Sequence, residues 1–328
     1  MNLNFIPRLR VALILAIFLT SVGNSLKAQK SPIPKWVKNY EFQDQKIEDQ
    51  SPGYHYLLLN EQENISEQTR FSHYAFKVTN NEGVQNMSNI SVSYDPSFQK
   101  LNFHEINVYR DGKKTDRLSL SSLQRIQREA NMENHLYDGA ETVYTNISDV
   151  RPGDIIEYSY SIKGYSPLNT GFFSQRLQLE YTIPVNRIVN RLITDNTLPL
   201  NYKLLNGADA PQVEEKGSSK IYTWDVVSNQ PFYFDSYTPT WYNPLKYVSV
   251  SSFSSWEEVV DWAEKLYDYS DSEMDKVSID YKEEASIESK ITTAIQFVQD
   301  EIRYLGLESG IGAYKPNPPL KVFDQRFG

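Results

Sequence analysis

Short segments in which apolar and polar residues alternate fill residues 51–230 of this chain, and turn residues separate one segment from the next. In "FSHYAFKV", Tyr74, Phe76 and Val78 share one face of an extended strand, because successive side chains of a strand point to opposite faces. The same alternation recurs in "SNISVSY" and "DIIEYSYSIK". Many short strands separated by turns predict an antiparallel β-sandwich as the first domain.

Local signals mark the expected turns of this domain and one helix. Asp111-Gly112, after "LNFHEINVYR", predicts a tight hairpin. Residues 81–83, Asn-Glu-Gly, predict another turn. Residues 118–134, "LSLSSLQRIQREANMEN", predict the one helical insertion, so the rest of the domain is expected to be β.

The hydrophobic period changes to that of a helix after an aromatic linker over residues 231–253. Ser255, followed three residues later by Glu258, forms a capping box and predicts the start of a helix. "SIESKITTAIQFVQDEIRYLG" predicts a long helix, and "NPPLKVFDQRFG" a short one that begins at proline. Residues 254–328 are therefore expected to form the helical start of a second domain. The buried stripe expected on the long helix consists of Ile287, Ile291, Ala294, Ile295, Val298 and Ile302.

Residues 1–28 predict a secretory signal peptide. Arg8 and Arg10 precede the apolar run "VALILAIFLTSVG", which is shorter than the roughly 20 residues of a membrane span. We expect cleavage after Ala28 and export to the periplasm or to the medium, with residues 29–50 as a lead-in to the first domain. The alternative is an uncleaved N-terminal anchor. No later stretch of the sequence is apolar enough to predict a membrane span.

Composition narrows the classes of function. A net charge of −9 argues against nucleic acid and anionic membrane surfaces as partners. The 328 residues include no Cys, so they hold neither a disulfide nor a Cys nucleophile. The sequence shows no Gly-x-Ser-x-Gly elbow, no dinucleotide fingerprint and no P-loop, so no cofactor is expected.

The histidines and carboxylates predict neither a metal site nor a catalytic residue. No two of the four histidines are three or four residues apart, which is the clustering that a zinc site requires. Paired acids such as Glu257-Glu258 are typical of a solvated helix face rather than of a glycosidase. The histidines are His55, His73, His104 and His135.

The segment "NQPFYFDSYTPTWYNP" is dense in aromatic residues. Trp241 and Tyr242, with Tyr237 and the later Tyr304, form a candidate binding surface whose rings could stack on sugars. Large aromatic side chains mostly serve burial, which favours the alternative that they pack a domain interface. The other aromatic residues of the segment are Phe232, Tyr233 and Phe234.

The segment "SKITTAIQFVQDEIRYLGLESGIGAYKPNPPLKVFDQRFG" resembles the start of bacterial transglutaminase-like domains. The resemblance rests on Ile-Arg-Tyr at residues 302–304, on Pro316 and Pro318 in the loop, and on Arg-Phe-Gly at residues 326–328. It implies a papain-like fold in which Asp-Cys-Lys follows, with the Cys at a helix N-terminus that stabilises its thiolate. A His and an Asp further on would complete the triad. No catalytic residue of the family falls within the 328 residues.

Two upstream motifs resemble the uncharacterised β-rich module that precedes transglutaminase-like domains in exported bacterial proteins, notably of the Bacteroidetes. They are Asp-Gly-Lys at residues 111–113 and "PGDIIEY" at residues 152–158. Together the resemblances cover residues 50–328. They imply a truncated exported protein, inactive as given, whose parent is a Cys-dependent amide hydrolase or acyl transferase acting on peptides or cell-envelope material. The alternatives are a non-catalytic exported β-sandwich that binds a protein or glycan partner, and a purely structural envelope protein.

Overall fold

The computed structural model of the chain describes residues 29–45, 53–126, 140–169, 171–227, 230–280, 286–305 and 314–328. The predicted signal peptide over residues 1–28 lies outside the described residues, as does the end of the predicted lead-in. None of the helices in the described ranges is long and apolar enough to cross a membrane.

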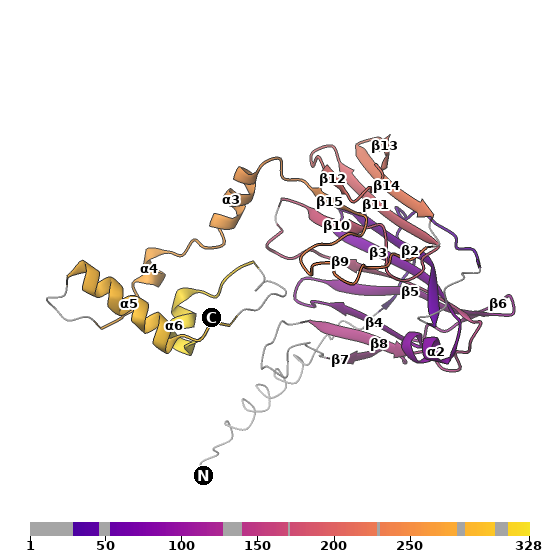
Figure 1. The fold of residues 1–328 in the computed structure, drawn as a ribbon, viewed down its shortest axis with the longest axis horizontal. Coiled ribbons are helices and arrows are strands. Elements are labelled where there is room, and N and C mark those ends of the chain that lie inside the picture. Colours follow the sequence, from indigo (N-terminus) through magenta and orange to yellow (C-terminus); the bar gives the residue numbers. More distant parts are fainter. Residues whose placement is uncertain are drawn as a thin grey trace, which may run out of the picture.

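The described part of the chain is mainly β, with one nine-stranded sheet and two three-stranded sheets (Figure 1). The large sheet has the order β1 (Gln29–Lys30), β5 (Lys100–Arg110), β9 (Ile155–Lys163), β3 (Thr69–Val78), β2 (Tyr54–Asn64), β11 (Arg187–Asp195), β14 (Ser219–Val227) and β13 (Gln212–Lys216), with β6 (Lys113–Asp116) also paired to β5. One small sheet has the order β10 (Ser174–Gln178), β15 (Tyr247–Ser251) and β12 (Asn201–Leu205). The other has the order β4 (Asn89–Tyr94), β8 (Glu141–Asn146) and β7 (Gln124–Ile126).

Both small sheets pack against the same face of the large sheet. Register pairs Leu59 on β2 with Tyr74, and Tyr74 with Tyr158. Tyr158 in turn pairs with Ile106 on β5, so these four side chains point to one face. Leu59 belongs to a hydrophobic cluster with residues of β10 and β15, and Ile106 to a cluster with residues of β4 and β8. The β domain therefore has two layers of sheet, as predicted for a sandwich. Two hydrophobic cores lie side by side between the large sheet and the two small sheets.

The prediction that the strands are antiparallel is correct for most pairs, but it is wrong for two. β1 pairs with β5 in parallel, and β2 pairs with β11 in parallel. A parallel pair needs a long crossover connection, and the chain from β3 to β10 lies between β2 and β11 in sequence. Alternation along a strand reports which face is buried and carries no information about strand direction.

The hairpin at Asp111-Gly112 is confirmed, but the turn predicted at Asn-Glu-Gly is wrong. Asp111 and Gly112 have φ angles of 51° and 75°, which a two-residue hairpin turn needs. Asn-Glu-Gly instead begins helix α2 (Asn81–Met87). Asn80 accepts a hydrogen bond through Oδ1 from the Gly83 N–H at 3.0 Å. This N-cap stabilises the first turn of a helix at residues whose sequence is also typical of a turn.

Two further segments differ from their predictions. Within the helix predicted over residues 118–134, Gln124–Ile126 form strand β7 and pair with β8, and residues 127–134 lie outside the described residues. The predicted linker over residues 231–253 contains β15, which is the central strand of a small sheet. Both strands are short, and their pairing with distant strands outweighs local sequence preference.

Residues 31–45 cross the other face of the large sheet, and we call this segment the strap. Arg191 on β11 donates from Nη1 to the Trp36 carbonyl at 3.1 Å. Gln62 on β2 binds the Lys38 backbone twice, accepting from its N–H at 2.9 Å and donating to its carbonyl at 2.6 Å. A third hydrophobic cluster forms between the strap and the sheet. The strap therefore covers the outer face of the sheet at its centre.

Four helices follow the β domain in the described residues, and they lie to one side of it (Figure 1). They are α3 (Trp256–Glu264), α4 (Asp271–Met274), α5 (Ile287–Glu301) and α6 (Pro319–Gln325). The predicted N-cap at Ser255 is confirmed, but the return contact of the capping box is shifted by one residue, to the N–H of Ser254. Ser255 Oγ accepts from the Glu258 N–H at 3.3 Å, while the Glu258 carboxylate accepts from the Ser254 N–H at 2.7 Å.

The apolar stripe that was predicted to be buried on α5 is exposed within the described part of the chain. Ile291, Ile295 and Val298 are 55%, 52% and 54% exposed. α5 contacts α6 instead through Phe297, whose ring stacks on that of Phe323 with 5.4 Å between the centroids. The contact between the two helices therefore leaves an apolar face of α5 uncovered.

Candidate functional site

A row of polar side chains crosses the outer face of the large sheet beneath the strap. His73 and Ser159 each lie between residues that face the core, so their own side chains face outward. Register places Glu105 on β5 opposite Ser159 on β9, and Ser159 opposite His73 on β3. His73 is in turn opposite Asn60 on β2. Four neighbouring strands therefore contribute one polar group each to the row.

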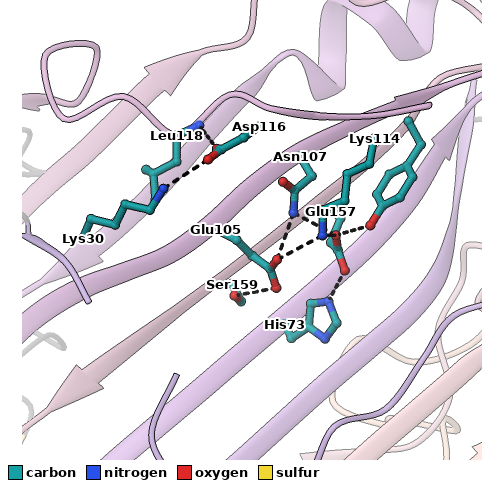
Figure 2. Close-up of polar contacts among 10 residues, drawn as sticks. Lys30, His73, Glu105, Asn107, Lys114, Asp116, Leu118, Glu157 and Ser159 are labelled. Carbon is teal, nitrogen blue, oxygen red and sulfur yellow. Dashed lines mark hydrogen bonds and ion pairs between the residues drawn. The ribbon is translucent and has the colours of Figure 1, made fainter. Parts of the chain in front are cut away.

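Glu157, which precedes Ser159 on the same face of β9, is the centre of the site (Figure 2). Its Oε1 lies 3.0 Å from His73 Nε2, and its Oε2 accepts from Tyr109 Oη at 2.7 Å and from Asn107 Nδ2 at 2.9 Å. Burial acts to raise the pKa of Glu157, but the hydrogen bonds from His73, Tyr109 and Asn107 outweigh it and lower the pKa to about 2. The buried carboxylate is therefore held ionised at any ordinary pH.

Lys114 places its ammonium between two carboxylates. Its Nζ lies 3.4 Å from Glu157 Oε2 and 3.5 Å from Glu105 Oε2, and half of its side chain is exposed (Figure 2). Burial acts to lower the pKa of Lys114, but the hydrogen bond with Tyr109 and the charges of both glutamates raise it above its ordinary value. Ser159 Oγ donates to Glu105 Oε1 at 3.3 Å, so Glu105 is also oriented. The two carboxylates therefore share the positive charge of one lysine side chain.

A cavity of about 530 Å³ lies between the strap and this row of side chains. Pockets of roughly 300–1,000 Å³ commonly hold small ligands. Tyr40 of the strap lines the cavity, and so do Asn60, His73, Glu105 and Glu157 of the sheet. Tyr40 Oη and Asn60 Nδ2 are buried without a hydrogen-bond partner among the described residues. Both residues line the cavity and each carries a buried polar atom without a partner among the described residues, so its wall is polar as well as aromatic.

Arg110 and Lys114, the residues on either side of the Asp-Gly-Lys motif, contact the "PGDIIEY" motif at and beside this site. Arg110, at the hairpin, donates from Nε and Nη2 to the two carboxylate oxygens of Asp154 at 2.8 and 2.7 Å. Asp154 is buried and also accepts from the Arg151 N–H at 2.8 Å. Lys114 of the hairpin likewise reaches Glu157 of "PGDIIEY". These contacts hold the β5–β6 hairpin against the start of β9, and the "PGDIIEY" motif supplies Glu157 to the site.

The predicted aromatic binding surface is exposed, but it is not one cluster. Tyr237, Trp241 and Tyr242 lie in the loop before β15 and are 96%, 84% and 47% exposed. The rings of Trp241 and Tyr242 meet edge to face at 6.2 Å between centroids. Tyr304 is 88% exposed and follows α5, on the helical side of the molecule. These side chains do not pack a domain interface within the described part of the chain.

Sequence reasoning missed the cluster of His73, Glu105 and Glu157. It sought histidines three or four residues apart, which suits ligands on one helix. In a sheet, side chains meet across neighbouring strands, and His73 and Glu157 are 84 residues apart in the chain. The available signal was the alternation itself, which places both residues on the outer face of strands whose inner face is apolar. The remaining histidines are His55 and His104, which are buried, and His135, which lies outside the described residues.

Comparison with known proteins places the chain in a family. Residues 66–233 match the family described as "Domain of Unknown Function with solved-structure structure (DUF3857)", and the chain belongs to this family. The matched residues include His73, Glu105, Lys114 and Glu157, so most of the site lies within the family's own domain. No curated protein matches the chain.

One solved structure shares the fold over most of this chain. It is the crystal structure of "a putative protease" from Parabacteroides distasonis, with a TM-score of 0.68 and 14% sequence identity. The likeness covers 84% of this chain and 56% of that protein, so the chain spans little more than half of its length. A structure described as "a putative nutrient binding protein" from Legionella pneumophila matches with a TM-score of 0.30 and 12% identity, over 84% of this chain and 94% of the other. The first likeness shows a shared fold, and the second is too weak to carry an argument.

Proposed function

We propose that this chain is the non-catalytic β-rich part, with the first helices of the catalytic domain, of an exported transglutaminase-like enzyme. The observation that carries the proposal is the shared fold with a longer protein described as a protease, of which this chain covers 56%. The motif at residues 302–304 and that at residues 326–328 add the resemblance to transglutaminase-like domains. The β domain, with its cavity and exposed aromatic loop, would hold peptide or cell-envelope material near the reaction.

The helical region supports this proposal through its contacts. After α5, Arg303 pairs with Phe327 in a short parallel bridge, and the Gly328 N–H donates to the Arg303 carbonyl at 3.0 Å. The two motif segments are therefore side by side, although 21 residues lie between them in sequence. The uncovered apolar face of α5 needs a covering layer, because contiguous exposed apolar surface is rare on soluble proteins. A sheet of an α+β catalytic domain would provide that layer.

The proposed chemistry is acyl transfer from an amide through a Cys thiolate. The sulfur attacks the amide carbonyl and the C–N bond breaks, while a His donates a proton to the leaving amine. Water or a second amine then takes the acyl group from the sulfur. The 328 residues contain no Cys, so the nucleophile of this proposal is outside them.

The gene and its product test this proposal. We expect the reading frame beyond the Gly328 codon to encode Asp-Cys-Lys, followed later by a His and an Asp. We expect the encoded enzyme to cleave or transpeptidate amide substrates, and replacement of its Cys by Ala to lower this activity by about a thousandfold or more. A stop codon directly after Gly328 in the native gene would overturn the proposal, and so would full activity of the Cys variant.

Exposed apolar surface on α5 gives a second, independent measurement on the 29–328 chain. We expect this chain to bind an apolar-surface dye, and the double variant Ile291→Glu/Ile295→Glu to lose most of the fluorescence, because its charges break the apolar face. Gln296→Glu is the matched control, since residue 296 is on the opposite side of the helix. Equal dye fluorescence in the parent and the double variant would show that α5 is covered.

A second candidate function is a glycan- or protein-binding module, and the exposure of the loop before β15 favours it. Trp241 and Tyr237 are 84% and 96% exposed, which is unusual for large aromatic side chains without a partner. We expect Trp241→Ala to weaken binding of the 29–328 chain to cell-envelope glycan by about tenfold, as measured by titration calorimetry. Tyr267→Ala, 62% exposed on the helical side, is the control. Unchanged binding in Trp241→Ala would remove this candidate.

A further inference from the structure

We propose that His73, Glu105 and Glu157 bind a divalent transition-metal cation at the floor of the cavity, and that the Lys114 ammonium occupies this position until the metal binds. The inference concerns the β domain alone and is independent of the enzyme proposed above. One nitrogen or oxygen atom from each of the three side chains lies within 4.8 Å of the other two. Imidazole and carboxylate together suit Zn²⁺ and its neighbours among the transition metals.

The spacing of the candidate ligand atoms is close to that of a metal site. With bonds of about 2.0–2.2 Å to Zn²⁺, two ligand atoms of a tetrahedral site are roughly 3.4 Å apart. His73 Nε2 and Glu157 Oε1 are 3.0 Å apart, so this pair needs almost no adjustment. Glu105 has to move by about one ångström, and its side chain is 27% exposed, so it has room to do so. His73 binds a metal through Nε2 as the neutral imidazole that carries its proton on Nδ1.

The surrounding hydrogen bonds orient the carboxylates as outer-shell partners do in metal sites. Tyr109 and Asn107 both bind Glu157 Oε2, which leaves Oε1 directed towards His73 (Figure 2). Asn107 Nδ2 also donates to Glu105 Oε2 at 2.9 Å, so a single amide holds both glutamates. Glu157 is therefore fixed in orientation before any cation arrives, whereas the more exposed Glu105 keeps the freedom to move towards the metal.

Lys114 is suited to leave the site. Its contacts with Glu157 and Glu105, at 3.4 and 3.5 Å, are longer than the roughly 2.7–2.9 Å of strong charged hydrogen bonds. Its side chain is half exposed and belongs to β6, which pairs only with β5 among the described strands. A divalent cation would balance both carboxylates, whereas one ammonium balances only one of them. The displaced ammonium remains protonated and turns into solvent.

Asn60 provides an observation that is independent of the acidic groups. It is opposite His73 in register, is 1% exposed, and lines the same cavity, yet its Nδ2 has no partner among the described residues. The amide orientation is fixed, because Gln62 Nε2 donates to Asn60 Oδ1 at 3.2 Å and also to the Lys38 carbonyl. Asn60 Nδ2 is therefore a buried donor that lacks an acceptor among the described residues, and an oxygen atom in the cavity can fill this role. A water or carboxylate on the open side of the metal supplies that oxygen.

Calorimetric titration of the chelator-free 29–328 chain with ZnCl₂ tests the proposal. We expect one strong site, and we expect Lys114→Met to tighten binding by about tenfold or more, because it removes the resident cation. A mere network of ion pairs predicts no tighter binding in this variant. Lys113→Met, one residue earlier on the same exposed hairpin, is the matched control and should leave the affinity unchanged.

Ligand variants complete the test. We expect Glu105→Gln and His73→Gln each to weaken Zn²⁺ binding by about tenfold or more. Circular dichroism tests whether each variant is folded. If His73→Gln unfolds, Glu105→Gln still tests the proposal, because Glu105 is the more exposed of the two residues. Visible absorption of bound Co²⁺ gives a second measurement, which should disappear in both variants. Unchanged zinc affinity in Glu105→Gln, or no gain in Lys114→Met, overturns the proposal.

Discussion

Replacing Glu157 with Ala is expected to destabilise the β domain by about 2–4 kcal/mol. The carboxylate is buried, and it accepts from Tyr109 at 2.7 Å and Asn107 at 2.9 Å, beside His73 at 3.0 Å. Without it these groups lose their acceptor while they stay beneath the strap, and buried polar groups without partners are costly. Urea unfolding followed by circular dichroism measures the change in the free energy of unfolding.

Glu105→Ala is the matched control for this prediction. Glu105 contacts the same Asn107 and Lys114, but its side chain is 27% exposed, so water can replace those contacts. We expect a loss below about 1 kcal/mol. Glu157→Gln should fall between the two variants, since an amide oxygen still accepts from Tyr109. Equal losses in Glu157→Ala and Glu105→Ala would contradict the central position assigned to Glu157.

The predictable part of the fold is the part that local patterns determine. The faces of β3 and β9 follow from alternation, because one side of each strand is buried in the core. The hairpin at Asp111-Gly112 and the helix N-cap at Ser255 follow from residues that are neighbours in sequence. In each case the deciding contacts lie within a few residues of the chain.

The remaining parts of the fold depend on partners that are distant in sequence. Strand β13 is entirely exposed, and its residues Gln-Val-Glu-Glu-Lys show no alternation that could predict it. The parallel pairing of β2 with β11 depends on the path of the whole chain between them. The same holds for the site, since register alone brings His73 beside Glu157. The same holds for the ion pair of Arg110 with Asp154, whose two residues are 44 positions apart in the chain.

Raising the pH from about 4.5 to 8 is expected to destabilise the wild-type chain, relative to Glu61→Gln, by up to about 3 kcal/mol. Glu61 lies on the inner face of β2, where Tyr74 Oη donates to Oε1 and Ser72 Oγ donates to Oε2 at 2.9 Å. Burial raises the pKa of Glu61 to about 7, against the opposing effects of the Arg70 charge and the Ser72 hydrogen bond.

The direction of this effect follows from proton binding in the two states. The pKa of Glu61 is about 7 in the folded chain and near 4.5 in the unfolded chain. The folded chain therefore holds more protons than the unfolded chain in this pH range. The contribution of the protonated Glu61 carboxyl to the free energy of unfolding is fully present below about pH 4.5. This contribution is lost as the pH rises through about 7. Glu61→Gln keeps one acceptor oxygen for these two hydroxyl groups and places an NH2 group at the other position, and it has no proton to lose.

The measurement is the free energy of unfolding in urea at several pH values, for the wild type and for Glu61→Gln. Burial lowers the pKa of His55 and of His104, so their titration stabilises the fold as the pH rises and opposes the effect of Glu61. The difference between the two chains removes these contributions and isolates Glu61. Glu214→Gln, on exposed β13, should follow the wild type. A difference between wild type and Glu61→Gln that stays constant with pH would show that Glu61 is already ionised in the fold, and that the inner face accommodates its charge.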